Sequence, residues 1–201
     1  YWPAKFRELH QKHILAIFIV DTARFNGLTQ VIGKAGDRYI IYLNRALFSS
    51  KPNDWITRET TLCLQDEYRP HVKACLFPEG QNIPIKTVEH VLLHEYAHVF
   101  SYIHNEAPLP NQSFSNKQGY FPLIETGFSS GKIMYEWSQQ GLGNLQILSS
   151  RPIDHIQKID LTAFRQLNKS LVQSPFPTGY STRSSDEMVA ELFTQFIHQQ
   201  Y

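Results

Sequence analysis

The most constraining feature of this sequence is an apolar run, Val91–Phe100, that carries three polar residues in a fixed pattern. Within it, residues 94–98 read His-Glu-Tyr-Ala-His, an H-E-x-x-H motif. The run predicts an α-helix, on which each residue advances by about 100°, so His94 and His98 lie within roughly 40° of each other. Because burying two imidazoles and the Glu95 carboxylate in an apolar helix costs free energy, the pattern indicates that these groups have a function.

The chemistry that fits this pattern is metal-assisted hydrolysis, most often of a peptide bond. Two imidazoles one helical turn apart can bind a single zinc ion, and a glutamate beside them can take a proton from a water on that ion. The motif therefore predicts one Zn²⁺ bound by His94 and His98, with Glu95 as the general base. A catalytic zinc keeps three protein ligands and leaves one position for water, so the sequence must supply a third ligand.

One candidate for the third ligand is Glu187, near the start of a helix predicted at residues 184–200. Glu191 follows one turn later on the same face and could fix a ligand histidine by accepting a hydrogen bond from its other ring nitrogen. Tyr180 precedes Glu187 by seven residues and could stabilise the oxyanion that forms on the substrate. Residues 184–187 also form a helix-capping sequence, which explains Glu187 without a metal but does not explain Glu191.

The other candidate is His104. His94, His98 and His104 have the spacing of the metzincin metalloproteases, and Ile133–Tyr135 resembles the methionine turn of that group. The metzincin pattern has a glycine where this chain has Ser101, and that glycine lets the helix stop so that the third histidine turns back. If the helix continues through Ser101, His104 lies about 240° round from His98 and points away from the metal.

Composition limits the classes of partner. The chain has 201 residues, a net charge of +1 and 42% hydrophobic residues, which predicts one globular domain over residues 1–201. The absence of a basic cluster argues against a nucleic-acid partner, and no apolar run has the length of a membrane span. We therefore expect a soluble protein. Its localisation stays open, with secretion and delivery into another cell among the alternatives, and so does its oligomeric state. Cys63 and Cys75 are too few for a disulfide framework; they could form a single disulfide or be two buried thiols, and we favour the thiols.

Patterns of apolar and turn residues divide the chain into four parts. We expect an N-terminal sheet part at about 1–86, an active-site helix at about 87–105 with Thr87 as its N-cap, an insertion at about 106–175, and the ligand helix at 184–200.

Further elements are predicted inside these parts. We expect helices at 4–12 and 161–172 and a loop at 106–131. We expect a buried strand at 13–20 and two more strands at 30–33 and 38–44, joined by a turn at Gly36-Asp37.

The chain resembles the zincin metallopeptidases and, more narrowly, the gluzincin branch, in which a late helix supplies a glutamate ligand; within that branch it looks most like the catalytic domain of anthrax lethal factor and related bacterial peptidases. Val91–Phe100, Tyr180 and Glu187–Phe193 carry this resemblance. It implies an α+β, zincin-like fold in which a small mixed sheet packs on the H-E-x-x-H helix and the C-terminal part is mainly helical. It also implies that the substrate backbone pairs with an edge strand, for which 39–44 and 74–77 are candidates.

The resemblance implies a zinc-dependent endopeptidase acting on a protein or peptide, such as a selective toxin or effector that cleaves an intracellular protein. His98 and Glu187 are 89 positions apart, which is long for this group, so the insertion at 106–175 is expected to shape the cleft or bind substrate. Three alternatives stay open: a non-catalytic zinc-fold binding module, a metzincin-type protease that uses His104, and a hydrolase of a non-peptide bond.

Overall fold

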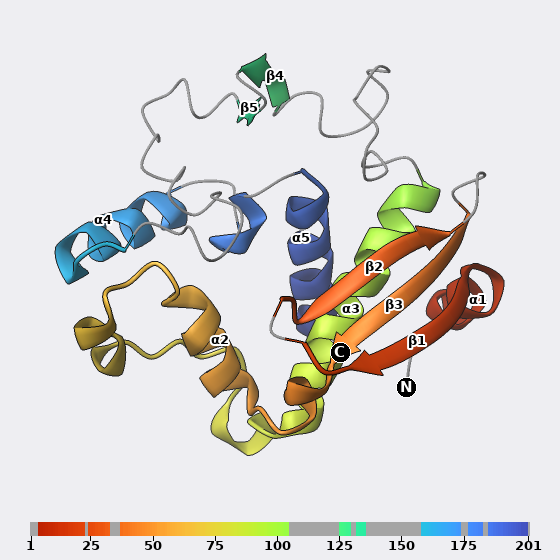
Figure 1. The fold of residues 1–201 in the computed structure, drawn as a ribbon, viewed down its shortest axis with the longest axis horizontal. Coiled ribbons are helices and arrows are strands. Elements are labelled where there is room, and N and C mark those ends of the chain that lie inside the picture. The colour runs from red at the N-terminus through yellow and green to blue at the C-terminus, as the bar shows by residue number, and fades with distance from the viewer. Residues whose placement is uncertain are drawn as a thin grey trace.

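A three-stranded sheet lies against one long helix, α3 (Pro84–Ile103) (Figure 1). The computed structural model describes residues 4–22, 24–32, 37–104, 125–129, 132–135, 158–173, 177–182 and 185–200. The fold class is α+β, with a mixed sheet and helices, as expected from the sequence.

The remaining elements follow in chain order. The other helices are α1 (Ala4–His13), α2 (Pro52–Thr60), α4 (Leu161–Val172) and α5 (Ser185–Gln200). The strands are β1 (Ile14–Val20), β2 (Gly27–Ile32), β3 (Arg38–Asn44), β4 (Glu125–Ser129) and β5 (Lys132–Tyr135). No helix in these described segments has both the length and the apolar character needed to cross a membrane.

The sheet has the strand order β1-β3-β2, with β1 parallel and β2 antiparallel to β3. Tyr39 and Ile41 of β3 have no exposed surface, and Leu43 is almost fully buried, because this central strand is covered by α3 on one face. Residues 39–44, one of the two candidates for the substrate-pairing edge, therefore form the central strand. Residues 74–77, the other candidate, are not in a strand. The edge strand that contacts α3 is β2.

Strand β1 was predicted as a buried strand, but it is an edge strand of this sheet. Leu15, Phe18 and Ile19 are 51%, 48% and 52% exposed. Its continuous apolar run predicted burial on both faces, and such a run does not say whether a neighbouring strand or helix covers it. Among the described strands, only β3 pairs with β1.

The core fills the space between the sheet and α3. Aromatic and aliphatic side chains from the two layers share it: Tyr39, Ile41, Leu43, Val88, Val91, Tyr96 and Val99. Fully burying an aliphatic or aromatic side chain of this kind contributes about 1.5–3 kcal/mol. Core residues from Val88 to Val99 thus attach α3 to the sheet. This packing also determines in which directions the other side chains of α3 point.

Helix α3 begins at Pro84, three residues before the predicted start. Proline suits the first turn of a helix because its missing N–H is not needed there. Thr87 is not the N-cap, since Ile83 holds that position without a side-chain hydrogen bond. The Thr87 hydroxyl instead donates to the carbonyl of Ser50 from within the helix. The helix runs on without a break through Ser101.

The C-terminal helices agree with the sequence more closely. Helix α4 has the predicted bounds, and Asp160 caps it by accepting a hydrogen bond from the Ala163 N–H at 2.8 Å. Helix α5 begins at Ser185 and packs along α3 (Figure 1). Of the predicted loop at 106–131, residues 125–129 form β4, which pairs with β5, and the rest lies outside the described residues.

Candidate metal centre

Two histidines of α3 and one glutamate of α5 meet at the interface of these helices. Nε2 of His94 lies 3.0 Å from Oε2 of Glu187, Nε2 of His98 lies 3.3 Å from the same oxygen, and the two Nε2 atoms are 3.2 Å apart. All three side chains are buried. The sequence prediction of His94, His98 and Glu187 as one group is thus matched by the geometry.

This donor set fits a small cation. Tetrahedral bonds of about 2.0–2.1 Å place neighbouring ligand atoms about 3.3–3.4 Å apart, close to the three separations of this cluster. Neutral imidazole nitrogens and a carboxylate oxygen would repel one another at such distances unless a proton or a metal ion lies among them. The buried cluster of His94, His98 and Glu187 could therefore hold a metal ion.

A fourth residue determines which nitrogen of His94 faces the cluster. Oε1 of Glu191 lies 2.9 Å from Nδ1 of His94. A proton on Nδ1 leaves the Nε2 lone pair directed at the ligand group, an arrangement common at metal-binding histidines. Glu191 thus occupies the position predicted for it, one turn beyond Glu187. Nδ1 of His98 is buried and has no hydrogen-bond partner among the described residues.

The charges of the cluster are strongly coupled. Burial alone would lower the pKa of His94, but hydrogen bonds and charge from Glu187 and Glu191 raise it well above its ordinary value. Burial likewise opposes a raised pKa at His98, and Glu187 outweighs it. The pKa of Glu187 lies well below its ordinary value because its two histidine partners outweigh burial. A metal ion would take the place of the protons that these groups share.

Glu95, the predicted general base, lies on α3 beside the sheet. Its carboxylate is buried, and Oε2 accepts a hydrogen bond of 2.7 Å from the hydroxyl of Thr29 on β2. Burial raises the pKa of Glu95, although His98 and His94 lower it in part. Gly27 of the same strand packs so closely that a Cβ atom there would lie 2.3 Å from Oε1 of Glu95.

Tyr180 stands at the edge of the cluster, in a short 3-10 helix just before α5. Its hydroxyl donates to Oε1 of Glu187 at 3.0 Å, and its ring lies edge-on to the His94 ring with centroids 5.7 Å apart. The side chain is 39% exposed. The structure therefore brings Tyr180 beside the group of His94 and Glu187, as the sequence predicted, and leaves it within reach of solvent.

His104 does not join this group. Because α3 continues through Ser101, His104 is the C-cap residue of the helix, is exposed, and lies against the Phe100 ring with centroids 4.4 Å apart. Ile133–Tyr135, which resembles a methionine turn, lies in strand β5. The geometry that a metzincin-type site needs at Ser101 is absent from this helix.

Sequence reasoning missed four residues around the centre. Gly27 and Thr29 contact Glu95, Asp186 accepts a hydrogen bond of 3.4 Å from Tyr102, and the Tyr102 ring stacks on His98 with centroids 5.9 Å apart. Asp186 directly precedes Glu187 and was interpreted as part of a cap. Gly27 and Thr29 gave no signal, because they preceded the predicted strand.

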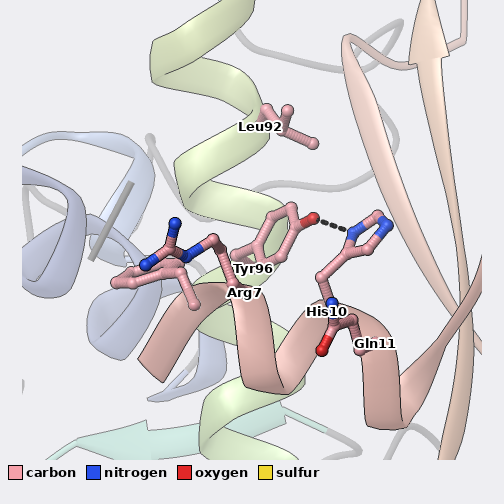
Figure 2. Close-up of a pocket in the computed structure, with 6 residues that line it drawn as sticks. Arg7, His10, Gln11, Leu92 and Tyr96 are labelled. Atoms are coloured by element: carbon pink, nitrogen blue, oxygen red, sulfur yellow. Dashed lines mark hydrogen bonds between the residues drawn. The ribbon is translucent and has the colours of Figure 1, made fainter. Parts of the chain in front are cut away.

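A hollow lies between α3 and α1, on the side of α3 opposite to the metal centre (Figure 2). Its volume is about 260 Å³, and its lining residues are Phe6, Arg7, His10, Gln11, Leu92 and Tyr96. The Tyr96 hydroxyl forms a hydrogen bond with Nδ1 of His10. Leu92 and Tyr96 are on average about 160° round the helix from His94 and His98, so this hollow is separate from the metal centre.

No protein family, curated protein or solved structure matches this chain. The evidence for function is therefore the geometry of the centre itself. Cys63 and Cys75 are both free thiols, the alternative favoured from the sequence, but only Cys63 is buried, since Cys75 is exposed; neither lies in the ligand group.

Proposed function

We propose that this protein is a zinc-dependent peptidase of the zincin type, with His94, His98 and Glu187 as the zinc ligands. The observation that supports it most directly is the set of three ligand atoms separated by 3.0–3.3 Å. Two nitrogens and one carboxylate oxygen form a donor set that suits catalytic zinc and leaves a fourth position for water. Glu191 supports the same proposal, because its contact with Nδ1 directs Nε2 of His94 toward the ligand group.

Glu95 performs the proton transfers in this proposal. A zinc ion in the cluster supplies a Lewis acid that lowers the pKa of a water and polarises a carbonyl group. The Glu95 carboxylate accepts a proton from the attacking water and then delivers it to the leaving amine. Its buried position suits this role, since burial raises the pKa of Glu95 toward the range in which a carboxylate both takes and returns a proton.

Tyr180 stabilises the negative charge that develops on the substrate oxygen. Its hydroxyl already points at the ligand group, where it donates to Oε1 of Glu187. A hydroxyl directed there can donate to an oxyanion once the substrate is bound. The partial exposure of the ring fits a residue at the mouth of the site.

Strand β2 supports a peptide as the substrate. It is the edge strand that contacts α3, and its Thr29 reaches Glu95 directly. Within the described part of the chain, its outer edge pairs with no other strand. An extended peptide can add to such an edge through backbone hydrogen bonds, which would place a scissile bond next to Glu95.

The test is a comparison of wild type with Glu95→Gln, with zinc per chain measured by elemental analysis and hydrolysis measured on a quenched fluorescent peptide library. We expect both proteins to hold one zinc, and the variant to lose about 10²–10⁴-fold in rate. An active Glu95→Gln protein would refute the proposal. A zinc-loaded wild type that cleaves no peptide would instead favour the non-catalytic binding module or a non-peptide substrate.

A further inference from the structure

We infer that Thr29 is a positioning residue for the general base Glu95, and that Gly27 gives the strand the close approach this requires. The inference rests on the proposed function and adds two residues of β2 to the site. Among the described residues, the Thr29 hydroxyl forms its hydrogen bonds to Glu95, and the atoms nearest to a Cβ at Gly27 belong to Glu95, so we infer that both residues act through Glu95.

The hydrogen bond between Thr29 and Glu95 is short and buried. The Thr29 hydroxyl is 2.7 Å from Oε2 of Glu95 and 3.1 Å from the Glu95 backbone oxygen. A hydroxyl has one hydrogen, and the shorter contact to a charged carboxylate is the stronger of the two. Both residues are more than nine-tenths buried, so water does not readily replace this bond.

Gly27 restricts the other oxygen of the same carboxylate. A Cβ atom at this position would lie 2.3 Å from Oε1 of Glu95 and 2.8 Å from its Cγ and Cδ atoms. Contacts this short force one of the partners to move, so the strand backbone and the carboxylate are packed without spare room. Glycine is the residue that permits this distance.

The strand is itself held firmly at this point. Gly27 and Thr29 are paired with Leu43 and Ile41 of the central strand β3. The turn before β2 is tied down by Asn44, whose side-chain amide donates to the carbonyls of Thr22 at 2.6 Å and Phe25 at 3.1 Å. The hydroxyl of Thr29 is thus presented from a rigid support, as precise positioning requires.

These contacts favour the orientation in which the carboxylate lies. Oε2 is engaged by Thr29, while Oε1 accepts no hydrogen bond among the described residues and remains available for a proton. Without the hydroxyl, Glu95 could rotate away from the attacking water. Supporting contacts of this kind change activity by about 10–100-fold in metal sites.

The experiment compares zinc-loaded wild type with Thr29→Val, Thr29→Ser and Gly27→Ala, using the peptide that wild type cleaves best from the fluorescent library. Thr61→Val is the matched control, because Thr61 is also a buried threonine. Unlike the Thr29 hydroxyl, the Thr61 hydroxyl donates to backbone carbonyls near the end of α2. We expect Thr29→Val and Gly27→Ala to lower kcat about 10–100-fold, with KM within about twofold and zinc content unchanged. Thr29→Ser, which keeps the hydroxyl, should recover most of the rate.

A second measurement does not depend on activity. In urea unfolding, Thr29→Val should lower the midpoint more when it is introduced into wild type than when it is introduced into Glu95→Ala, because the two side chains are coupled. Equal shifts in both backgrounds, or a Thr29→Val protein with the kcat of wild type, would overturn the inference while leaving the proposed function intact. Wild type that cleaves nothing, or an active Glu95→Gln, would overturn both.

Discussion

Oε1 of Glu191 lies 2.9 Å from Nδ1 of His94, on the far side of the ring from the ligand group. One turn of α5 therefore supplies both a ligand candidate and the residue that orients another. This relationship also explains a carboxylate that helix capping could not explain, because Glu191 lies well inside the helix.

Removing this contact should weaken metal binding. Glu191→Ala leaves Nδ1 of His94 without its acceptor, so the ring is free to change tautomer and orientation. We expect the zinc affinity to fall about 10–100-fold, measured by competition with a chelator dye. Glu89→Ala is the control, since Glu89 lies on α3 but pairs with Lys86. Equal affinities for wild type and Glu191→Ala would show that the contact does not orient His94.

The two candidates for the third ligand are separated by one pair of variants. Glu187→Ala removes the only carboxylate within 3.3 Å of both Nε2 atoms in the described part of the chain, so it should lose its zinc. His104→Ala changes an exposed side chain that contacts Phe100 and should keep one zinc per chain. The measurement is zinc content after dialysis. Loss of zinc from His104→Ala but not from Glu187→Ala would instead indicate a metzincin-type site.

Tyr180→Phe should separate catalysis from metal binding. The variant keeps the ring beside His94 and removes the hydroxyl that donates to Glu187. We expect kcat to fall about 10²–10³-fold, the usual loss of one oxyanion donor, with zinc retained. Tyr42→Phe provides a matched control, because the Tyr42 hydroxyl binds Gln30 on the sheet. A Tyr180→Phe protein with normal kcat would exclude the oxyanion role.

His90 should make the protein less stable in acid. Burial, with help from His198 and His94 and against the charge of Glu191, lowers the pKa of His90 to about 4. The unfolded chain, with a pKa of 6.5, binds the proton more readily, so His90 destabilises the fold as the pH falls from 6.5 toward 4. The loss amounts to about 3 kcal/mol once both states are protonated.

Urea unfolding of the zinc-free protein between pH 4 and 8 measures this effect. His90→Phe keeps a ring beside Trp55 but cannot bind a proton, so its stability should fall less steeply below pH 6.5. His198→Phe is a companion variant, because Nε2 of His198 is 3.0 Å from Nδ1 of His90 and burial lowers its own pKa as well. Parallel curves for wild type and both variants would contradict the assignment.

The sequence predicted local features well and long-range ones poorly. Glu187 and Glu191 were found because helical spacing puts them on one face, and the predicted helix at 161–172 is likewise a local element, whose cap, Asp160, directly precedes it. The order of the strands depends on pairings between distant residues, so neither candidate for the edge strand, 39–44 or 74–77, is an edge strand in the structure. Thr29 was invisible because its role arises only when β2 folds against Glu95, 66 positions away.

The ligand group joins two helices that are far apart in the chain, since His98 and Glu187 are 89 positions apart. An ion held there would act as a cross-link that closes a long loop, and cross-links of long loops restrict the unfolded chain most. Helix α5 would then owe part of its attachment to the ion. A chain that had not acquired its metal would keep the packing of α5 against α3 but lack this cross-link, so it would unfold more readily than the loaded chain.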